Sequence, residues 1–191
     1  IKFAPTSFGN VFEYTDVRNA DFGIVIDSTS TENSTLLVQN SIIRNMLYNV
    51  IYSVNANVEI YNSLLYNAGE NILHLEGGEY KIVHCTITNN YSFSWGGRTM
   101  PILCYSNKNN PFKVEMINSI VYGNYSSEID YKIDEEGLPA EYVFKNCLVK
   151  QYMKTVDTNI YKDCLINSSP KFVYEAIKDD TYRQYDYHLT S

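Results

Sequence analysis

Short stretches of alternating apolar and polar residues recur along this chain, and each ends in the same way. Apolar residues at every second position, such as Val58 and Ile60, lead into an asparagine, a small residue and a second short alternation. Alternate residues of a strand point to the same side, so each stretch predicts two strands, each with one buried face, joined by a turn at the asparagine. The copies are L-L-V-Q-N-S-I-I-R-N from Leu36, V-E-I-Y-N-S-L-L-Y-N from Val58, K-I-V-H-C-T-I-T-N from Lys81, V-E-M-I-N-S-I-V-Y-G-N from Val114 and V-F-K-N-C-L-V-K from Val143.

The spacing of these copies predicts a solenoid. Two degenerate copies, from Phe12 and Ile160, extend the series, whose turn positions are Asp16, Asn40, Asn62, His84, Asn118, Asn146 and Asp163. A period near 22 residues with variable insertions is typical of stacked repeats. A repeat this short leaves no room for a helix beside its strands. We therefore expect one all-β domain over residues 1–191, built from about eight coils of short parallel strands with asparagine at a corner.

This pattern resembles the right-handed parallel β-helix of the pectate-lyase-like superfamily, with an asparagine ladder at one corner. The closing segment, with P-K-F at Pro170 and D-Y-H-L at Asp186, resembles the last coil of bacterial surface β-helix proteins. The resemblance implies an exported protein in the extracellular space, at the cell surface or in the periplasm. Both ends interrupt the repeat, so we expect a fragment of a longer protein with flanking domains.

Two further rows follow each turn. In the six copies from Leu36 onward, the first residue after the turn is small and the third is aliphatic, so both are expected to face inward: Ser41, Ser63, Cys85, Ser119, Cys147 and Cys164; Ile43, Leu65, Ile87, Val121, Val149 and Ile166. The residue between them should point outward, and five of its six copies are aliphatic: Ile42, Leu64, Thr86, Ile120, Leu148 and Leu165. A contiguous apolar stripe usually marks a covered surface. Either a loop, flanking sequence or another chain covers it, or the bend turns it partly inward.

A third strand follows in each coil and predicts a strip of outward side chains. If Ile51, Leu73 and Ile129 face inward, alternation places Tyr52, His74 and Asp130 outward. Leu103 or Tyr105 would join them from the intervening coil, and Glu76 and Lys132 would extend the row. In the pectate-lyase-like superfamily, substrate grooves commonly follow such a face. His74, Asp130 and Lys132 are candidate catalytic residues if the protein is an enzyme, although any solvated strand face could show the same set.

The largest insertion contains the single tryptophan of the chain. Tyr91, Phe93, Trp95 and Arg98 lie within a 12-residue expansion of one coil. Insertions of a solenoid often gather on its binding face. These residues form either a platform for a ligand, together with Tyr52 and Tyr105, or a cover over an apolar patch.

Composition narrows the possible partners. The net charge of −7 disfavours nucleic acid, and no apolar run approaches the ~20 residues of a membrane helix. The 18 tyrosines suit either half-buried strand faces or stacking on sugars. Cys147 and Cys164 fall on adjacent coils, as free thiols or as a disulfide. No compact acidic cluster or zinc-type spacing indicates a metal or another cofactor.

Three functions remain open from these residues. The first is a non-catalytic domain that binds a polysaccharide or other glycan, or serves as an adhesive spacer. The alternative is a polysaccharide lyase or glycoside hydrolase acting in a groove along the β-helix. The third is a purely structural rod.

Overall fold

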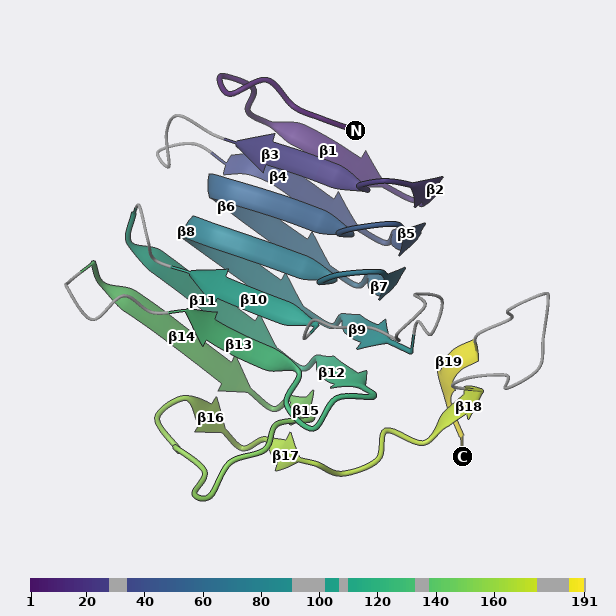
Figure 1. The fold of residues 1–191 in the computed structure, drawn as a ribbon, viewed down its shortest axis with the longest axis vertical. Helices are drawn as coiled ribbons and strands as arrows, with labels where there is room; N and C mark the ends of the chain where they lie inside the picture. Colours follow the sequence, from purple (N-terminus) through teal and green to yellow (C-terminus); the bar gives the residue numbers. More distant parts are fainter. Residues whose placement is uncertain (28–33, 91–101, 107–109, 133–137, 175–185, 191) are drawn as a thin grey trace.

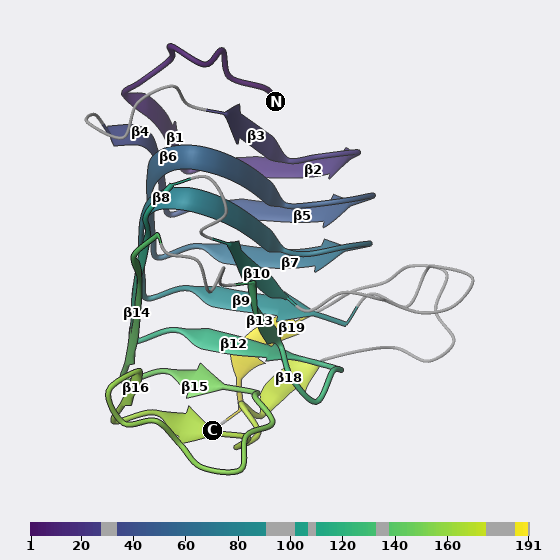
Figure 2. The same cartoon turned by 60° about the vertical axis from the view of Figure 1, so that its left-hand side comes forward.

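The structure is a computed structural model that describes residues 1–27, 34–90, 102–106, 110–132, 138–174 and 186–190. It is an all-β parallel solenoid of about four turns, and its described residues form no helix (Figure 1). Each complete turn has three sides, and every side is a stack of parallel strands (Figure 2). The predicted all-β solenoid is therefore confirmed.

The three sides are defined by their strands. Side one comprises β1 (Asn10–Glu13), β4 (Ser34–Gln39), the second halves of β6 (Ile51–Tyr61) and β8 (Leu73–Val83), β11 (Phe112–Ile117), β14 (Ala140–Lys145) and β16 (Tyr161–Lys162). Side two comprises β2 (Asp16–Ala20), β5 (Ile42–Met46), β7 (Leu64–Ala68), β9 (Thr86–Asn89), β12 (Ile120–Gly123), β15 (Leu148–Val149) and β17 (Leu165–Ile166). Side three comprises β3 (Ile24–Asp27), the first halves of β6 and β8, β10 (Leu103–Ser106) and β13 (Ile129–Lys132).

The expected number of eight coils is wrong. The insertions between repeats consume chain length without adding turns, and the last copies are short. β15, β16 and β17 are two residues each, and the described residues after β15 include no further strand on side three. Seven copies of the sequence phrase therefore yield about four turns.

The predicted corner between sides one and two is confirmed at six of its seven positions. Asn40, Asn62, His84, Asn118, Asn146 and Asp163 all have positive φ, between 46° and 55°. This left-handed conformation is more accessible to asparagine and aspartate than to most residues. In the first coil the corner residue is Tyr14, with φ 51°, while Asp16 pairs with Ile42 and lies two residues beyond the corner. The anchor placed at Asp16 is therefore wrong.

Side-chain bonding at this corner is limited. The Asn62 amide donates to the Asn40 side-chain oxygen at 2.7 Å, as expected. Asn62 is exposed, however, so the expectation that its amide is buried is wrong. A second row of asparagines, at the far end of side two, is bonded in the same way: Asn67 donates to Asn45 at 3.1 Å, and Asn45 donates to Asn19 at 3.4 Å.

The small residues after the corner form a ladder of their own. The Ser63 hydroxyl donates to the carbonyl of Tyr61 and accepts the backbone N–H of Ser41 from the preceding coil, at 2.7 and 3.1 Å. Ser119 accepts the N–H of Cys85 in the same way, and the Cys164 sulfur accepts that of Cys147. Cys147 and Cys164 are free thiols in the structure. A small side chain that can both donate and accept is required here, because each hydroxyl or thiol bonds a carbonyl of its own coil and a backbone N–H of the preceding coil.

The core is a stack of rows that follow the predicted alternation. Leu36, Val58 and Val114 on side one are no more than 1% exposed, and Ile43 and Leu65 on side two are fully buried. Pairs of aromatic rings pack together in the later coils. Examples are Tyr80 beside Phe112, Tyr131 beside Tyr142, and Phe144 beside Tyr161. Part of the tyrosine content therefore serves the interior.

The closing segment does not form a parallel coil. β18 (Phe172–Tyr174) and β19 (Asp186–Leu189) pair antiparallel as a separate sheet, and this hairpin lies against the outer face of side two (Figure 1). Phe172 and Tyr187 pack with Tyr66, and Leu64, Ile120 and Tyr122 border that cluster. The outward stripe is thus partly covered at Leu64 and Ile120, while Ile42 and Leu165 are 37% and 60% exposed.

The ladder of small residues predicts that Ser63→Ala destabilises the protein. This substitution removes the acceptor for the buried Ser41 N–H, so we expect the free energy of unfolding in urea to fall by about 1–3 kcal/mol. Ser63→Cys is the matched control, because Cys85 and Cys147 occupy the same row, and it should retain most of the stability. Equal losses in both variants would show that shape, not hydrogen bonding, sets this position.

The aromatic cluster beneath the hairpin predicts that Phe172→Ala detaches the hairpin from side two and leaves the solenoid folded. Removing a buried ring costs about 3–5 kcal/mol, and this loss falls on a small two-stranded sheet. We expect faster hydrogen exchange and proteolysis at residues 172–174 and 186–190, with an unchanged melting temperature for the solenoid. Val173→Ala, on the exposed side of the same strand, should change neither. Unfolding of the whole chain in Phe172→Ala would instead make the hairpin part of the main cooperative unit.

Candidate functional site

The outer face of side three carries two parallel rows of residues, which we call the outer strip. One row runs through Val25, Tyr52, His74, Cys104 and Asp130, and the other through Asp27, Val54, Glu76, Ser106 and Lys132. The inward positions expected for Ile51, Leu73 and Ile129 are confirmed, since each is at most 3% exposed. Tyr52, His74 and Asp130 accordingly share one outward row.

The expected contribution of Leu103 to this row is wrong, because Leu103 is fully buried. Tyr105 pairs in register with Leu75, and its side chain lies outside the described part of the chain, so its contribution stays a prediction. The residue opposite His74 is Cys104. The aligned copies N-I-L-H-L-E and P-I-L-C-Y-S already place these two residues at the same position. A shift of one residue along a strand moves a side chain to the other face, which is why the earlier expectation fails.

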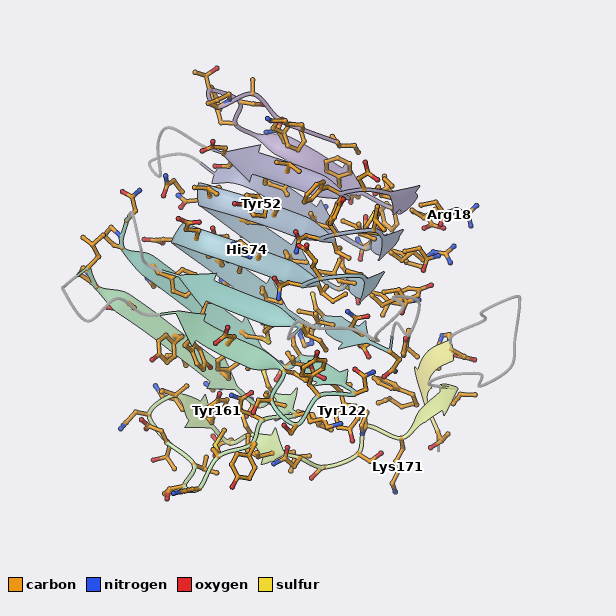
Figure 3. The ribbon with its side chains drawn as sticks, viewed as in Figure 1. Arg18, Tyr52, His74, Tyr122, Tyr161 and Lys171 are labelled. Atoms are coloured by element: carbon orange, nitrogen blue, oxygen red, sulfur yellow. The ribbon has the colours of Figure 1, made fainter. Side chains whose placement is uncertain are left out.

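Tyr52 and His74 stack on each other at the centre of the strip. Their ring centroids are 4.7 Å apart and their planes differ by 13° (Figure 3). Phe22 meets Tyr52 edge-on at 6.4 Å and stacks with Tyr48 at 5.1 Å. Tyr48 is 40% exposed and the other three rings are half-buried. The result is a continuous aromatic surface whose rings are held by one another and by the sheet.

Carboxylates flank this aromatic surface. Asp27 and Glu76 both pair in register with Val54, two residues beyond Tyr52, so they lie diagonally on either side of the Tyr52 ring. Partial burial raises the pKa of the Tyr52 hydroxyl, and the negative charges of Glu76 and Asp27 raise it further. The negative charges of both carboxylates therefore act on the Tyr52 hydroxyl.

The candidate catalytic residues are not brought into direct contact. β10 lies between the strands of His74 and Asp130, which at about 4.8 Å per strand places their Cα atoms about 10 Å apart. Lys132 lies on the same strand as Asp130, two residues further on, and the described part of the chain does not include its side chain. Tyr91, Phe93, Trp95 and Arg98, the candidate ligand platform, lie outside the described residues.

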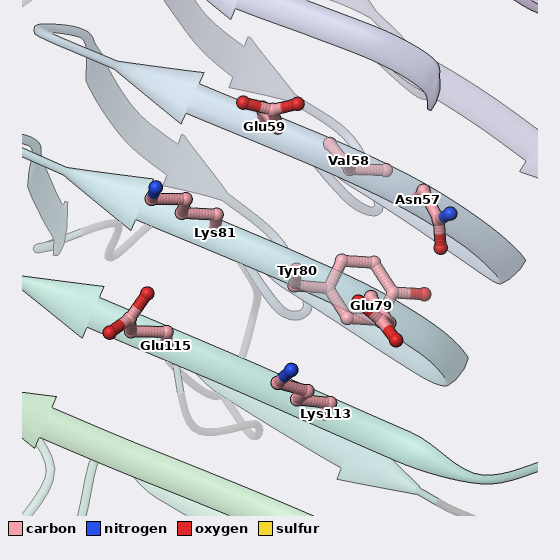
Figure 4. Close-up of a pocket in the computed structure, with 8 residues that line it drawn as sticks. All are labelled: Asn57, Val58, Glu59, Glu79, Tyr80, Lys81, Lys113 and Glu115. Atoms are coloured by element: carbon pink, nitrogen blue, oxygen red, sulfur yellow. The ribbon is translucent and has the colours of Figure 1, made fainter. Parts of the chain in front are cut away.

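A second surface on side one is densely charged. It is a shallow depression of about 370 Å³ lined by Asn57, Val58, Glu59, Glu79, Tyr80, Lys81, Lys113 and Glu115 (Figure 4). Register places Lys81 between Glu59 and Glu115, and Lys113 between Glu79 and Glu141. Opposite charges therefore alternate across the strands, a pattern that stabilises a solvated sheet face. The one aromatic ring in its lining is that of Tyr80, which is buried.

A third surface is the groove between the hairpin and side two. It has a volume of about 640 Å³, and its lining includes Ile42, Leu64, Tyr66 and His188. Arg44 crosses its floor and binds both carboxylate oxygens of Asp16, at 2.9 and 3.1 Å, and the Tyr66 hydroxyl at 3.1 Å. The guanidinium is already engaged by three bonds within the fold. The sequence analysis predicts a covered stripe that includes Ile42 and Leu64, but it does not predict the groove, because residues far apart in the chain form it.

Among the described residues, no group of three or more His, Cys, Asp or Glu side chains is arranged to hold a metal ion. In that same part of the chain, no helix is long and apolar enough to cross a membrane.

The Asp16–Arg44 pair predicts a small pH-dependent term in stability. Hydrogen bonding to Arg44 lowers the pKa of Asp16 below its ordinary value. The pair therefore adds to the free energy of unfolding above the ordinary aspartate pKa, and this contribution is lost as the pH falls through the lowered pKa of Asp16 in the folded state. Because Asp16 is 40% exposed, we expect Arg44→Met to lose about 0.5–1 kcal/mol at neutral pH and less in acid. Arg18→Met, whose guanidinium lies 3.9 Å from Asp16, is the control and should cost little. A loss that does not vary with pH would mean that packing of the Arg44 stem causes it.

Comparisons of the chain with family models, curated proteins and solved structures found no match.

Proposed function

We propose that this chain is a non-catalytic β-helix domain that binds a polysaccharide or other glycan on the outer strip. The observation that carries this proposal is the stacked Tyr52–His74 pair, partly open to solvent and bordered by Phe22 and Tyr48. Partly exposed aromatic rings offer flat apolar area with polar edges, which suits the faces of sugar rings. The strands that carry the two rings are neighbours, about 4.8 Å apart, comparable with the length of one sugar residue.

Rigidity also favours binding at this place. Tyr52 and His74 are the second residues of β6 and β8, the longest strands among the described residues, and core residues lie behind them on the inward face. Little side-chain entropy is lost when a ligand meets rings that are already held in place. The loop around Trp95 follows β9 and precedes β10, so Trp95, Arg98, Tyr91 and Phe93 belong to this proposal as additional contacts.

The alternative of a lyase or hydrolase using His74, Asp130 and Lys132 receives less support. General acid–base chemistry needs groups within hydrogen-bonding reach of the same substrate bond. The Cα atoms of His74 and Asp130 are about 10 Å apart. At this separation the two side chains could act on one substrate bond only if both extended toward a ligand lying between them.

The proposal also includes the type of β-helix. We place the chain in the pectate-lyase-like superfamily, with right-handed turns and an asparagine ladder along the whole corner. The sequence repeat and the Asn62–Asn40 hydrogen bond support this placement. Nearly all parallel β crossovers are right-handed. A surface or secreted location, in a bacterial protein with flanking domains, rests on the resemblance of the repeat. If the domain is an adhesive spacer, it would bind glycans through the same strip with lower affinity.

The proposal predicts that Tyr52→Ala weakens glycan binding about tenfold, because the lost ring contact corresponds to about 1.4 kcal/mol. A glycan array would find the ligand and titration calorimetry would measure its affinity. Tyr52→Phe should retain binding, and Tyr152→Ala, which removes a tyrosine that is 70% exposed outside the strip, is the matched control. Urea unfolding would verify that each variant is folded. Absence of binding to any glycan would overturn the proposal, and turnover of a bound polysaccharide would establish the enzymatic alternative.

A further inference from the structure

We infer that the outer strip selects glycans that carry free amino groups, such as glucosamine oligomers, over neutral and acidic ones. This inference rests on the proposed function and adds the chemical class of the ligand. It follows from the juxtaposition of the Tyr52–His74 stack with the carboxylates of Asp27 and Glu76 on either side of it.

The first step is the position of the carboxylates. Asp27 comes from β3 and Glu76 from β8, and the strand between them carries Tyr52 two residues before the shared partner Val54. Diagonal neighbours on one sheet face lie about 7–8 Å apart, within reach of long side chains. A sugar resting on the Tyr52 ring would therefore place its substituents toward two carboxylates from opposite sides.

The second step is the sign of the field. Asp27 and Glu76 lie diagonally on either side of Tyr52, and their negative charges, together with partial burial, raise the pKa of its hydroxyl. The whole chain carries a net charge of −7, so distant charges add to this effect. Lys2, which pairs with Val25, and Lys132, separated from Glu76 by Ser106, mark the two ends of the strip. Its centre is acidic.

The third step is the chemistry of the ligand. An ammonium group is attracted both by the face of an aromatic ring and by nearby carboxylates. A uronate or sulfated sugar in the same place would meet Asp27 and Glu76 as like charges. An acetylated amino sugar would keep the ring stacking and lose the charge. One cation–π contact and one or two exposed ion pairs together correspond to about a tenfold preference.

The experiment compares three oligosaccharides of equal length by titration calorimetry, below the pKa of the sugar amine: a glucosamine oligomer, its N-acetylated counterpart and a galacturonate oligomer. We expect the glucosamine oligomer to bind about tenfold more tightly than the acetylated one, with little or no binding of the galacturonate. Added salt should reduce this preference, because the charges involved are exposed.

Matched variants separate the strip from the overall charge of the protein. Asp27→Asn combined with Glu76→Gln should abolish the preference while retaining binding of the acetylated oligomer. Glu141→Gln and Glu115→Gln together remove the same charge from side one and should leave the preference intact. Tyr52→Ala should weaken binding of both amino-sugar oligomers.

The outcomes are distinct. Tighter binding of the acetylated or galacturonate oligomer would overturn the inference and leave the proposed function standing. A preference that survives Asp27→Asn with Glu76→Gln, or that falls equally with the side-one variants, would also overturn it. No binding of any oligosaccharide on a broad array would overturn the proposed function itself.

Discussion

The structure depends on one constraint: each coil must turn its corner without leaving register with the next. At the corner between sides one and two, the residue with positive φ still donates its N–H to the adjacent coil. Asn40 donates to Tyr61, Asn62 to Val83, and His84 to Ile117, at 3.0–3.1 Å. The strands on both sides therefore keep the same pairing partners from coil to coil, and every other row of side chains follows from that alignment.

Constant register explains both the core and the outer strip. Inward positions stack aliphatic residues into a continuous core, and the row after the corner stacks hydroxyls and thiols that bond from one coil to the next. The same alignment sets Tyr52 beside His74 and places Asp27 and Glu76 on either side of Val54. A slip of one residue in β6 would bury Tyr52 and expose Ile51.

The sequence predicts what repeats and fails where the repeat is broken. Corner residues, inward rows and the outward positions of Tyr52, His74 and Asp130 follow from alignment of the copies. Tyr14 is missed because a tyrosine takes the left-handed conformation that asparagine usually signals. The second asparagine row could have been found, because the final letter of the regular copies is Asn45, Asn67 or Asn89. The antiparallel hairpin and its groove could not, because contacts between distant segments leave no periodic signal.

Tyrosine residues occupy two kinds of position in the structure, the core and the outward face of side three, which composition alone does not distinguish. Tyr80 and Tyr161 face inward, are at most 6% exposed, and have hydroxyl partners in Ser53 and Tyr131. These rings complete the core, and their removal would leave cavities. Tyr52 instead stands on the outward face, where the alternation of the strand requires no ring, and it stacks on another outward ring. A cross-strand aromatic pair on this face adds about 0.2–1 kcal/mol to the stability of the sheet, and the proposed glycan binding would give the same pair a second role.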